Sequence, residues 1–173
     1  MKSCSKDHTG FTMVELMIAI AILAILTTLA MPSLQQFMAR NELVGTSNAL
    51  ITGINLARTE AVTRSTAVGI CPSTDGAGCN DGAWESGFLV FVDDDNNSDF
   101  NGDDELIRAE SSYTNPAMTI AGTADVDGGF TFTADGILAA VGGGGSIDLT
   151  HDVAANGIQI TVNTGGQISS AKI

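Results

Sequence analysis

The pattern of apolar and polar positions divides the chain into a long helical part and a part made of short strands. An almost unbroken apolar run extends from Phe11 to Met31 and contains a single charged residue, Glu15. At about 1.5 Å per residue, a helix of this length is roughly 32 Å long, enough to cross the hydrocarbon core of a membrane. The pattern therefore predicts a membrane-spanning helix with a carboxylate about one turn from its start.

The helical pattern continues beyond Pro32. This proline is expected to kink the helix without ending it, because apolar residues recur at steps of three and four directly afterwards. The recurring positions are Leu43, Leu50, Ile54, Ala57 and Ala61. We therefore expect one helix from about Phe11 to about Arg64, whose second half packs this stripe on a sheet.

From residue 67 onward, the pattern changes to short apolar or alternating segments separated by turns rich in glycine and asparagine. The expected strands are 67–71, 87–92, 106–110, 118–121, 129–133, 146–150 and 157–162, and the last returns through a hairpin to 167–169. The run of four glycines within 141–145 predicts a flexible loop. The fold class is therefore α+β, with one long helix packed on an antiparallel sheet.

The N-terminal segment carries a specific motif. Gly10, Phe11, Thr12 and Glu15, followed by the apolar run and Pro32, resemble the N-terminus of type IV pilins and type II secretion pseudopilins. The resemblance implies that a prepilin peptidase cleaves between Gly10 and Phe11 and methylates the new N-terminus of Phe11. It also implies that Glu15 pairs with the N-terminal amine of a neighbouring subunit during assembly. The alternative is an ordinary signal anchor. A cleaved secretory signal fits poorly, because the apolar run is too long.

The same resemblance sets the expected organisation of the chain. Residues 1–10 form the leader, 11–31 the transmembrane helix that later lies in the filament core, 32–66 the periplasmic half of the helix, and 67–173 the β-sheet domain. Lys2 and Lys6 should keep the leader in the cytoplasm by the positive-inside rule. The chain should therefore cross the bacterial inner membrane once, with its C-terminal domain in the periplasm.

Further motifs narrow the family. They are LARTEAVTRS at 56–65, GICPS at 69–73, WESGFLVFVD at 84–93 and NGDDELIR at 101–108. Together with Phe130 and Gly136, they resemble the GspH/FimT type of minor subunit. The resemblance implies a structural subunit that initiates or caps assembly of a type IV pilus or a type II secretion pseudopilus. Its partners would be other pilins or pseudopilins, the prepilin peptidase and the assembly platform of the inner membrane.

Three cysteines are present, and Cys4 would leave with the leader. Cys71 and Cys79 flank a turn-rich loop that is expected outside the cytoplasm, which favours a disulfide. The alternative is a pair of metal ligands. However, the C-x7-C spacing does not suit zinc, and the cleaved chain would offer a single histidine, His151.

Acidic residues crowd the segment DDDNNSDFNGDDE at 93–105. Carboxylates at this density could hold Ca²⁺, and Asp95, Asp99 and Asp103 are the first candidates for its ligands. The alternative is a solvated loop between two strands, in which asparagine and glycine set the turns. Calcium is the one cofactor that the sequence suggests.

The formal net charge of −13 argues against nucleic-acid binding. Some relatives of this type bind DNA through a basic Gly-Arg-x-Arg element, and the matching stretch here, Gly166, Gln167, Ile168 and Ser169, contains no arginine. No catalytic motif accompanies His151, so we do not expect an enzyme. The alternative function is a ligand-binding or adhesive subunit at a filament tip that uses the cysteine loop or the acidic loop.

Overall fold

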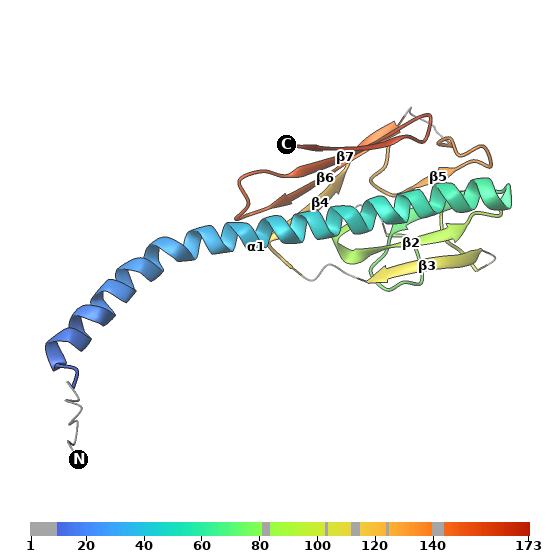
Figure 1. Ribbon diagram of the computed structural model, residues 1–173. Helices are drawn as coiled ribbons and strands as arrows, with labels where there is room; N and C mark the ends of the chain where they lie inside the picture. The colour runs from blue at the N-terminus through green and yellow to red at the C-terminus, as the bar shows by residue number, and fades with distance from the viewer. Residues whose placement is uncertain (1–9, 81–83, 103, 112–114, 124, 140–143) are drawn as a thin grey trace, which may run out of the picture.

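The computed structural model describes residues 10–80, 84–102, 104–111, 115–123, 125–139 and 144–173. A single long helix, α1 (Met13–Arg64), carries a β domain on its C-terminal half, while its N-terminal half projects away from the domain (Figure 1). The prediction of one helix from the apolar run into the domain is confirmed. Pro32 lies inside α1 without ending it, as expected, and the helix curves over its first half.

The strands form two four-stranded antiparallel sheets. Sheet A has the order β3-β2-β1-β5 and sheet B has the order β4-β6-β7-β8. The bounds are β1 (Val68–Pro72), β2 (Gly87–Val92), β3 (Glu105–Ser111), β4 (Met118–Gly122), β5 (Phe130–Phe132), β6 (Gly144–His151), β7 (Ile158–Asn163) and β8 (Ile168–Lys172). The sequence predicted all eight strands within a few residues, but it predicted one sheet and not two.

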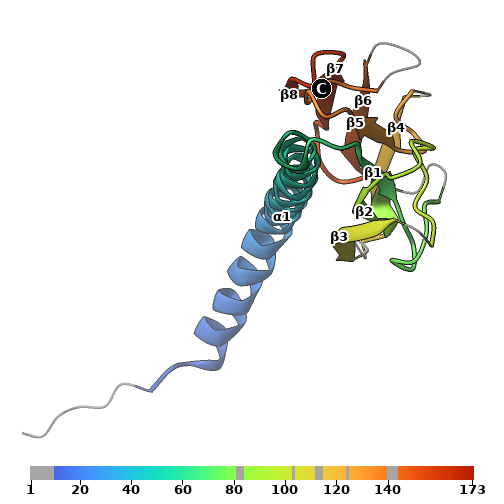
Figure 2. The same cartoon turned by 90° about the vertical axis from the view of Figure 1, so that its right-hand side faces the viewer.

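The core lies between α1 and both sheets. The buried stripe of the helix, which includes Leu43, Leu50 and Ile54, joins one apolar cluster with residues of sheets A and B. Figure 2, turned by 90°, shows both sheets on the same side of α1. The predicted packing stripe is therefore confirmed, and the α+β class with it.

Sheet A is covered on both faces, because β1 and β2 are buried along their whole length. Phe88 and Val90 of β2 belong to the main core under α1, whereas Leu89 and Phe91 belong to a second cluster beneath the disulfide. This alternation follows from the two-residue period of a strand. It explains why the β2 sequence is an unbroken apolar run.

The prediction of a flexible loop at 141–145 is wrong for its last two residues. Gly144 and Gly145 belong to β6, where they pair with Asn163 and Val162. A Cβ on Gly144 would lie 2.4 Å from the carbonyl oxygen of Val162, so the glycine serves close strand pairing. Residues 141–143 lie outside the described residues.

Candidate functional site

The N-terminal segment has Gly10 and Phe11 exposed ahead of α1, and the Phe11 residue is 82% accessible. Both sides of the expected cleavage point are therefore open to solvent in the isolated chain. Thr12 is the N-cap of α1, with extended backbone angles that let its hydroxyl face the first turn.

Glu15 forms a capping box with Thr12. The Thr12 hydroxyl accepts a hydrogen bond from the Glu15 N–H at 3.2 Å, and the Glu15 carboxylate accepts one from the Thr12 N–H at 3.0 Å. The carboxylate also accepts a bond from the Thr12 hydroxyl. The capping box was not among the features predicted from the sequence, although the spacing T-x-x-E is a recognised signal for it. In the isolated chain, the partner of the Glu15 carboxylate is therefore its own helix cap.

The apolar half of α1 projects away from the β domain (Figure 1). Its large side chains, from Phe11 to Met31, are more than half exposed where the structure describes them. By length and composition, α1 is able to span a membrane. An exposed apolar surface of this size needs lipid or other helices to cover it.

The two cysteines form the expected disulfide. The Sγ atoms of Cys71 and Cys79 are 2.01 Å apart, and the two Cα atoms are 5.5 Å apart. Cys71 is fully buried in β1, and the Phe100 backbone N–H donates a hydrogen bond to the Cys79 sulfur at 3.2 Å. The Phe100 ring packs 5.4 Å from that of Phe91. The disulfide loop therefore supports the acidic loop next to it.

In the acidic loop, carboxylate oxygens of Asp93, Asp95 and Asp104 lie within 4.8 Å of one another. This set shares only Asp95 with the predicted calcium ligands. Asp99 is exposed and is not a member of the cluster, and Asp103 lies outside the described residues. The carboxylates that lie together in the structure are therefore not the set that was predicted from the sequence.

These three carboxylates already accept hydrogen bonds within the fold. Asp93 is buried and accepts from the backbone of Asn97 and Ser98 and from the Thr131 hydroxyl, at 3.0 to 3.1 Å. Asp104 accepts from the N–H groups of Asp94 and Asn101. The carboxylates thus organise the loop backbone, which is the role of aspartate in a structured turn.

Arg58 and Arg64, the two arginines of the LARTEAVTRS motif, lie near the C-terminal end of α1. Arg58 donates to the carbonyl oxygens of Gly136 and Gly165, at 2.9 and 3.4 Å. Arg64 pairs with Glu60 at 2.6 Å and with Glu105 at 2.9 Å. The bond to Glu105, followed by that to Glu60, raises the pKa of Arg64 above its usual value. The motifs that lie far apart in the sequence therefore meet at the end of α1.

Trp84 and Gly87 belong to the WESGFLVFVD motif at 84–93. The Trp84 indole is fully buried and donates to the Val126 carbonyl oxygen at 3.2 Å, which anchors the start of β2. Gly87 has a φ of 107°, a value that favours glycine. The motif residues thus have structural roles.

His151 is also structural. Its side chain is 6% exposed, and its Nδ1 accepts a hydrogen bond from the Val153 N–H at 3.1 Å. Its Nε2 lies 3.7 Å from a Glu42 oxygen and 3.3 Å from Asn115 Nδ2. These contacts attach the end of β6 to α1.

Two family models match the chain. The model described as "Type II transport protein GspH" matches residues 46–166, which is more than half of the sequence. The chain belongs to the GspH family. A second model, "Prokaryotic N-terminal methylation motif", matches residues 5–31. Together with the apolar α1, that motif marks this GspH-family chain as a membrane-anchored pilin-like protein.

Solved structures agree on the fold of this GspH-family chain. The type IV minor pilin FimU of Pseudomonas aeruginosa matches with a TM-score of 0.59 at 21% identity, over 78% of this chain and 92% of FimU. The minor pseudopilin EpsH from the type 2 secretion system of Vibrio cholerae matches with a TM-score of 0.51 at 7% identity, over 75% of this chain and 96% of EpsH. The fold is therefore that of structural pilins.

A curated relative is also similar to the GspH-family chain. The pilin-like protein PilA1 of Thermus thermophilus is 34% identical over 97 residues. The match spans 56% of this chain and 56% of the length of PilA1.

Proposed function

We propose that the chain is a minor pilin or pseudopilin, a structural subunit that initiates or caps assembly of a type IV pilus or a type II secretion pseudopilus. The observation that carries the proposal is the continuity of α1. One helix joins a methylation motif and an exposed apolar half to a half that is buried against a GspH-type domain. Such a helix can be held by lipid first and by other helices later, while the domain stays folded.

Processing is the first step of this proposal. The prepilin peptidase removes residues 1–10 by cutting between Gly10 and Phe11, and the new amine of Phe11 is methylated. The exposure of both residues supports access by the peptidase. Residues 11–31 then hold the chain in the inner membrane, and residues 32–66 and 67–173 lie in the periplasm, where the assembly platform of the inner membrane acts on the subunit.

Glu15 and Pro32 belong to the assembly step. The Glu15 carboxylate exchanges its Thr12 partner for the Phe11 amine of a neighbouring subunit as the apolar helices pack together. Inside a helix bundle either charge alone is expensive, so a pair of opposite charges fixes the axial register. Pro32 lies in the curved first half of α1, and this curvature suits packing around a filament axis.

The proposal is tested by incorporation of variants into isolated filaments. Glu15→Ala and Gly10→Glu should abolish incorporation, the first by removing the charge partner and the second by blocking cleavage. Ser33→Ala is the matched control, because the Ser33 hydroxyl donates to the Ala30 carbonyl of its own helix and has no other hydrogen-bond partner within the part of the chain that the structure describes. Wild-type levels of Glu15→Ala or Gly10→Glu in filaments would overturn the mechanism.

A second function is a tip subunit that binds a ligand, with calcium at the acidic loop. It is favoured by one observation, the grouping of Asp93, Asp95 and Asp104. The hydrogen bonds that Asp93 and Asp104 already accept from the loop backbone favour the scaffold role. A calcium titration of the unfolding temperature separates the two functions.

A further inference from the structure

The acidic loop between β2 and β3 contains an acceptor signal for a covalent modification. Among the asparagines of the chain, Asn96 alone is followed two positions later by a hydroxyl residue, Ser98, and the residue between them is Asn97. Asparagine, any residue except proline, then serine or threonine is the acceptor signal for N-linked glycans on proteins outside the cytoplasm. Asp94 adds an acidic residue two positions before the acceptor, which bacterial enzymes of this kind select.

The loop geometry separates Asn96 from its neighbours. The amide nitrogens of Asn97 and Asn101 both donate to a carboxylate oxygen of Asp95, at 2.8 and 3.2 Å. The Asn96 side chain has no hydrogen-bond partner among the described residues, and Asn96 is exposed. Its φ of 58° is a left-handed conformation that asparagine tolerates. The Asn96 amide nitrogen can therefore react without breaking a contact within the described part of the loop.

Ser98, the second residue that the signal requires, is held by the base of the loop. Its backbone N–H donates to the Asp93 carboxylate at 3.1 Å, and its Oγ lies 3.0 Å from the hydroxyl oxygen of the buried Thr131. Ser98 is nevertheless exposed. Both residues of the signal therefore lie on the surface of a loop whose base is fixed by the fold.

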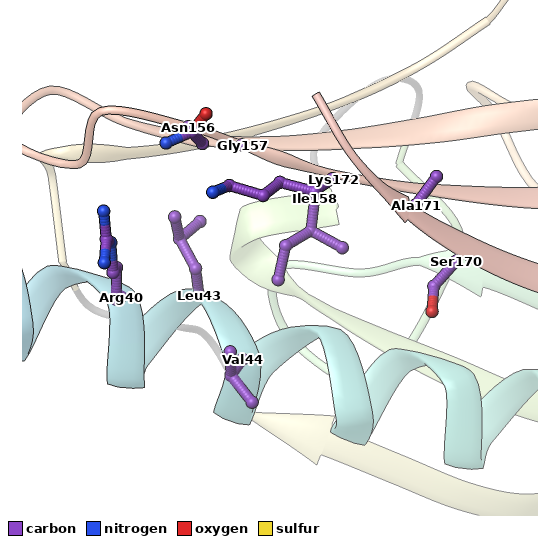
Figure 3. A pocket seen from close by; sticks show the side chains of 9 residues that line it. All are labelled: Arg40, Leu43, Val44, Asn156, Gly157, Ile158, Ser170, Ala171 and Lys172. Carbon is purple, nitrogen blue, oxygen red and sulfur yellow. The ribbon is translucent and has the colours of Figure 1, made fainter.

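The loop lies away from the end at which α1 enters the domain. Glu105, directly after the loop, pairs with Arg64 in the last turn of α1 (Figure 1). At the entry end, Arg40 of α1 and Lys172 of β8 line a groove between helix and sheet (Figure 3). Arg40 and Arg64 are 24 positions apart on one helix, so the two ends are separated by roughly 36 Å. A glycan on the loop would leave the apolar half of α1 free to enter a membrane or a filament.

We propose that Asn96 carries an N-linked oligosaccharide, transferred from a lipid diphosphate carrier on the periplasmic side of the membrane. The proposal rests on the proposed function for the periplasmic location of the domain. In the transfer, Asn96 Nδ2 forms a bond to C1 of the first sugar, and the bond between C1 and the diphosphate oxygen breaks. The lipid diphosphate leaves, and one amide proton passes to a base of the transferase. The product places a bulky, hydrated group on the acidic loop.

The test uses the full-length chain purified from the membranes and filaments of its own cells. Trypsin releases residues 65–108 as one peptide, because no lysine or arginine lies between Arg64 and Arg108. After reduction of the disulfide, we expect this peptide to carry mass increments of whole sugar residues. Electron-transfer fragmentation should assign these increments to Asn96.

Three substitutions separate the acceptor signal from the rest of the loop. Asn96→Asp removes the amide and keeps a residue that tolerates the positive φ, and Ser98→Gly removes the hydroxyl at a φ of 63° that suits glycine. Both variants should lose the glycan completely. Asn97→Asp is the matched control, because it makes the same charge change as Asn96→Asp but preserves the signal. This variant should keep the glycan.

Three results would overturn the inference: a peptide 65–108 that is unmodified at Asn96, sugars assigned to serine or threonine instead, or a glycan that survives in Ser98→Gly. The peptide that begins at methylated Phe11 tests the proposed function in the same sample. A processed chain in filaments without sugar would refute the glycan and leave the subunit role standing. A glycosylated chain that keeps its leader would refute the processing and leave the modification standing.

Discussion

Arg58 Nε donates a hydrogen bond to the Gly136 carbonyl oxygen at 2.9 Å, although the two residues are 78 positions apart. Arg58 lies near the end of α1, and Gly136 lies in the turn that follows β5 of sheet A. The same guanidinium reaches Gly165, in the turn between β7 and β8 of sheet B. One side chain therefore ties both sheets to the helix.

Removal of this side chain should destabilise the domain. Gly136 is buried, so Arg58→Ala leaves its carbonyl oxygen without the guanidinium. A lost hydrogen bond to a charged group typically costs about 1.5–3 kcal/mol. We expect the free energy of unfolding of the full-length chain in detergent, measured by urea titration, to fall by this amount.

Arg108→Ala is the control for that measurement. Arg108, whose side chain is 37% exposed, forms an ion pair with Glu110. Ion pairs that are exposed to solvent typically contribute about 0–1 kcal/mol to the free energy of unfolding. Equal losses for the two variants would contradict the role assigned to Arg58.

Gly53 should resist substitution for a steric reason. Within a helix, a change from glycine to alanine normally stabilises by about 0.8–1 kcal/mol. A Cβ on Gly53 would lie 2.4 Å from Cε2 of the buried Phe88 ring. Gly53→Ala should therefore lower the unfolding free energy by about 1–2 kcal/mol in the same urea titration.

Gly45→Ala is its matched partner, because nothing lies within 4 Å of the added Cβ in the same helix. This variant should be neutral or slightly more stable than the wild type. If Gly53→Ala behaved in the same way, the close contact between α1 and β2 would be refuted.

The disulfide should contribute to stability through the loop that it closes. For a separation of eight residues, the chain-entropy relation gives about 2.5 kcal/mol. Cys71→Ser with Cys79→Ser should therefore lower the unfolding temperature in a thermal scan monitored by circular dichroism. The wild type with added reductant should approach the double variant, and the double variant should not respond to reductant. No difference between wild type and double variant would show that the bridge is dispensable.

The acidic loop provides a test between scaffold and ligand-binding functions. A calcium site with a dissociation constant of about 0.1 mM would add about 1.4 kcal/mol at 1 mM calcium. The scaffold function predicts no change in unfolding temperature between 1 mM CaCl₂ and EDTA. A rise in the wild type that Asp95→Asn removes would instead support the tip-binding function.

The sequence predicted the parts of this molecule that depend on local pattern. The helix and the positions of the strands follow from periodicity and turn residues, and the disulfide follows from a cysteine pair that flanks a turn-rich loop expected outside the cytoplasm. The division into two sheets was not predictable in this way, because β5 pairs with β1 and β4 pairs with β6 across long stretches of chain. Strand pairing of this kind depends on tertiary packing, which a local pattern does not contain.

The acidic loop shows a second limit. The density of carboxylates in 93–105 suggested Asp95, Asp99 and Asp103 as the first candidates for calcium ligands. Asn96 and Ser98 adopt positive φ values of 58° and 63°, which turn the chain so that Asp93 is enclosed by its own loop. Such turns in residues other than glycine are rarely evident from sequence.

The central claim, that the chain is a processed pilin-like subunit, is tested most directly by mass spectrometry of its N-terminal peptide in purified filaments. We predict a peptide that begins at Phe11 and carries one N-methyl group, with residues 1–10 absent. The Gly10→Glu variant should remain in the membrane fraction with its leader attached. A chain found in filaments with its leader intact would contradict the account.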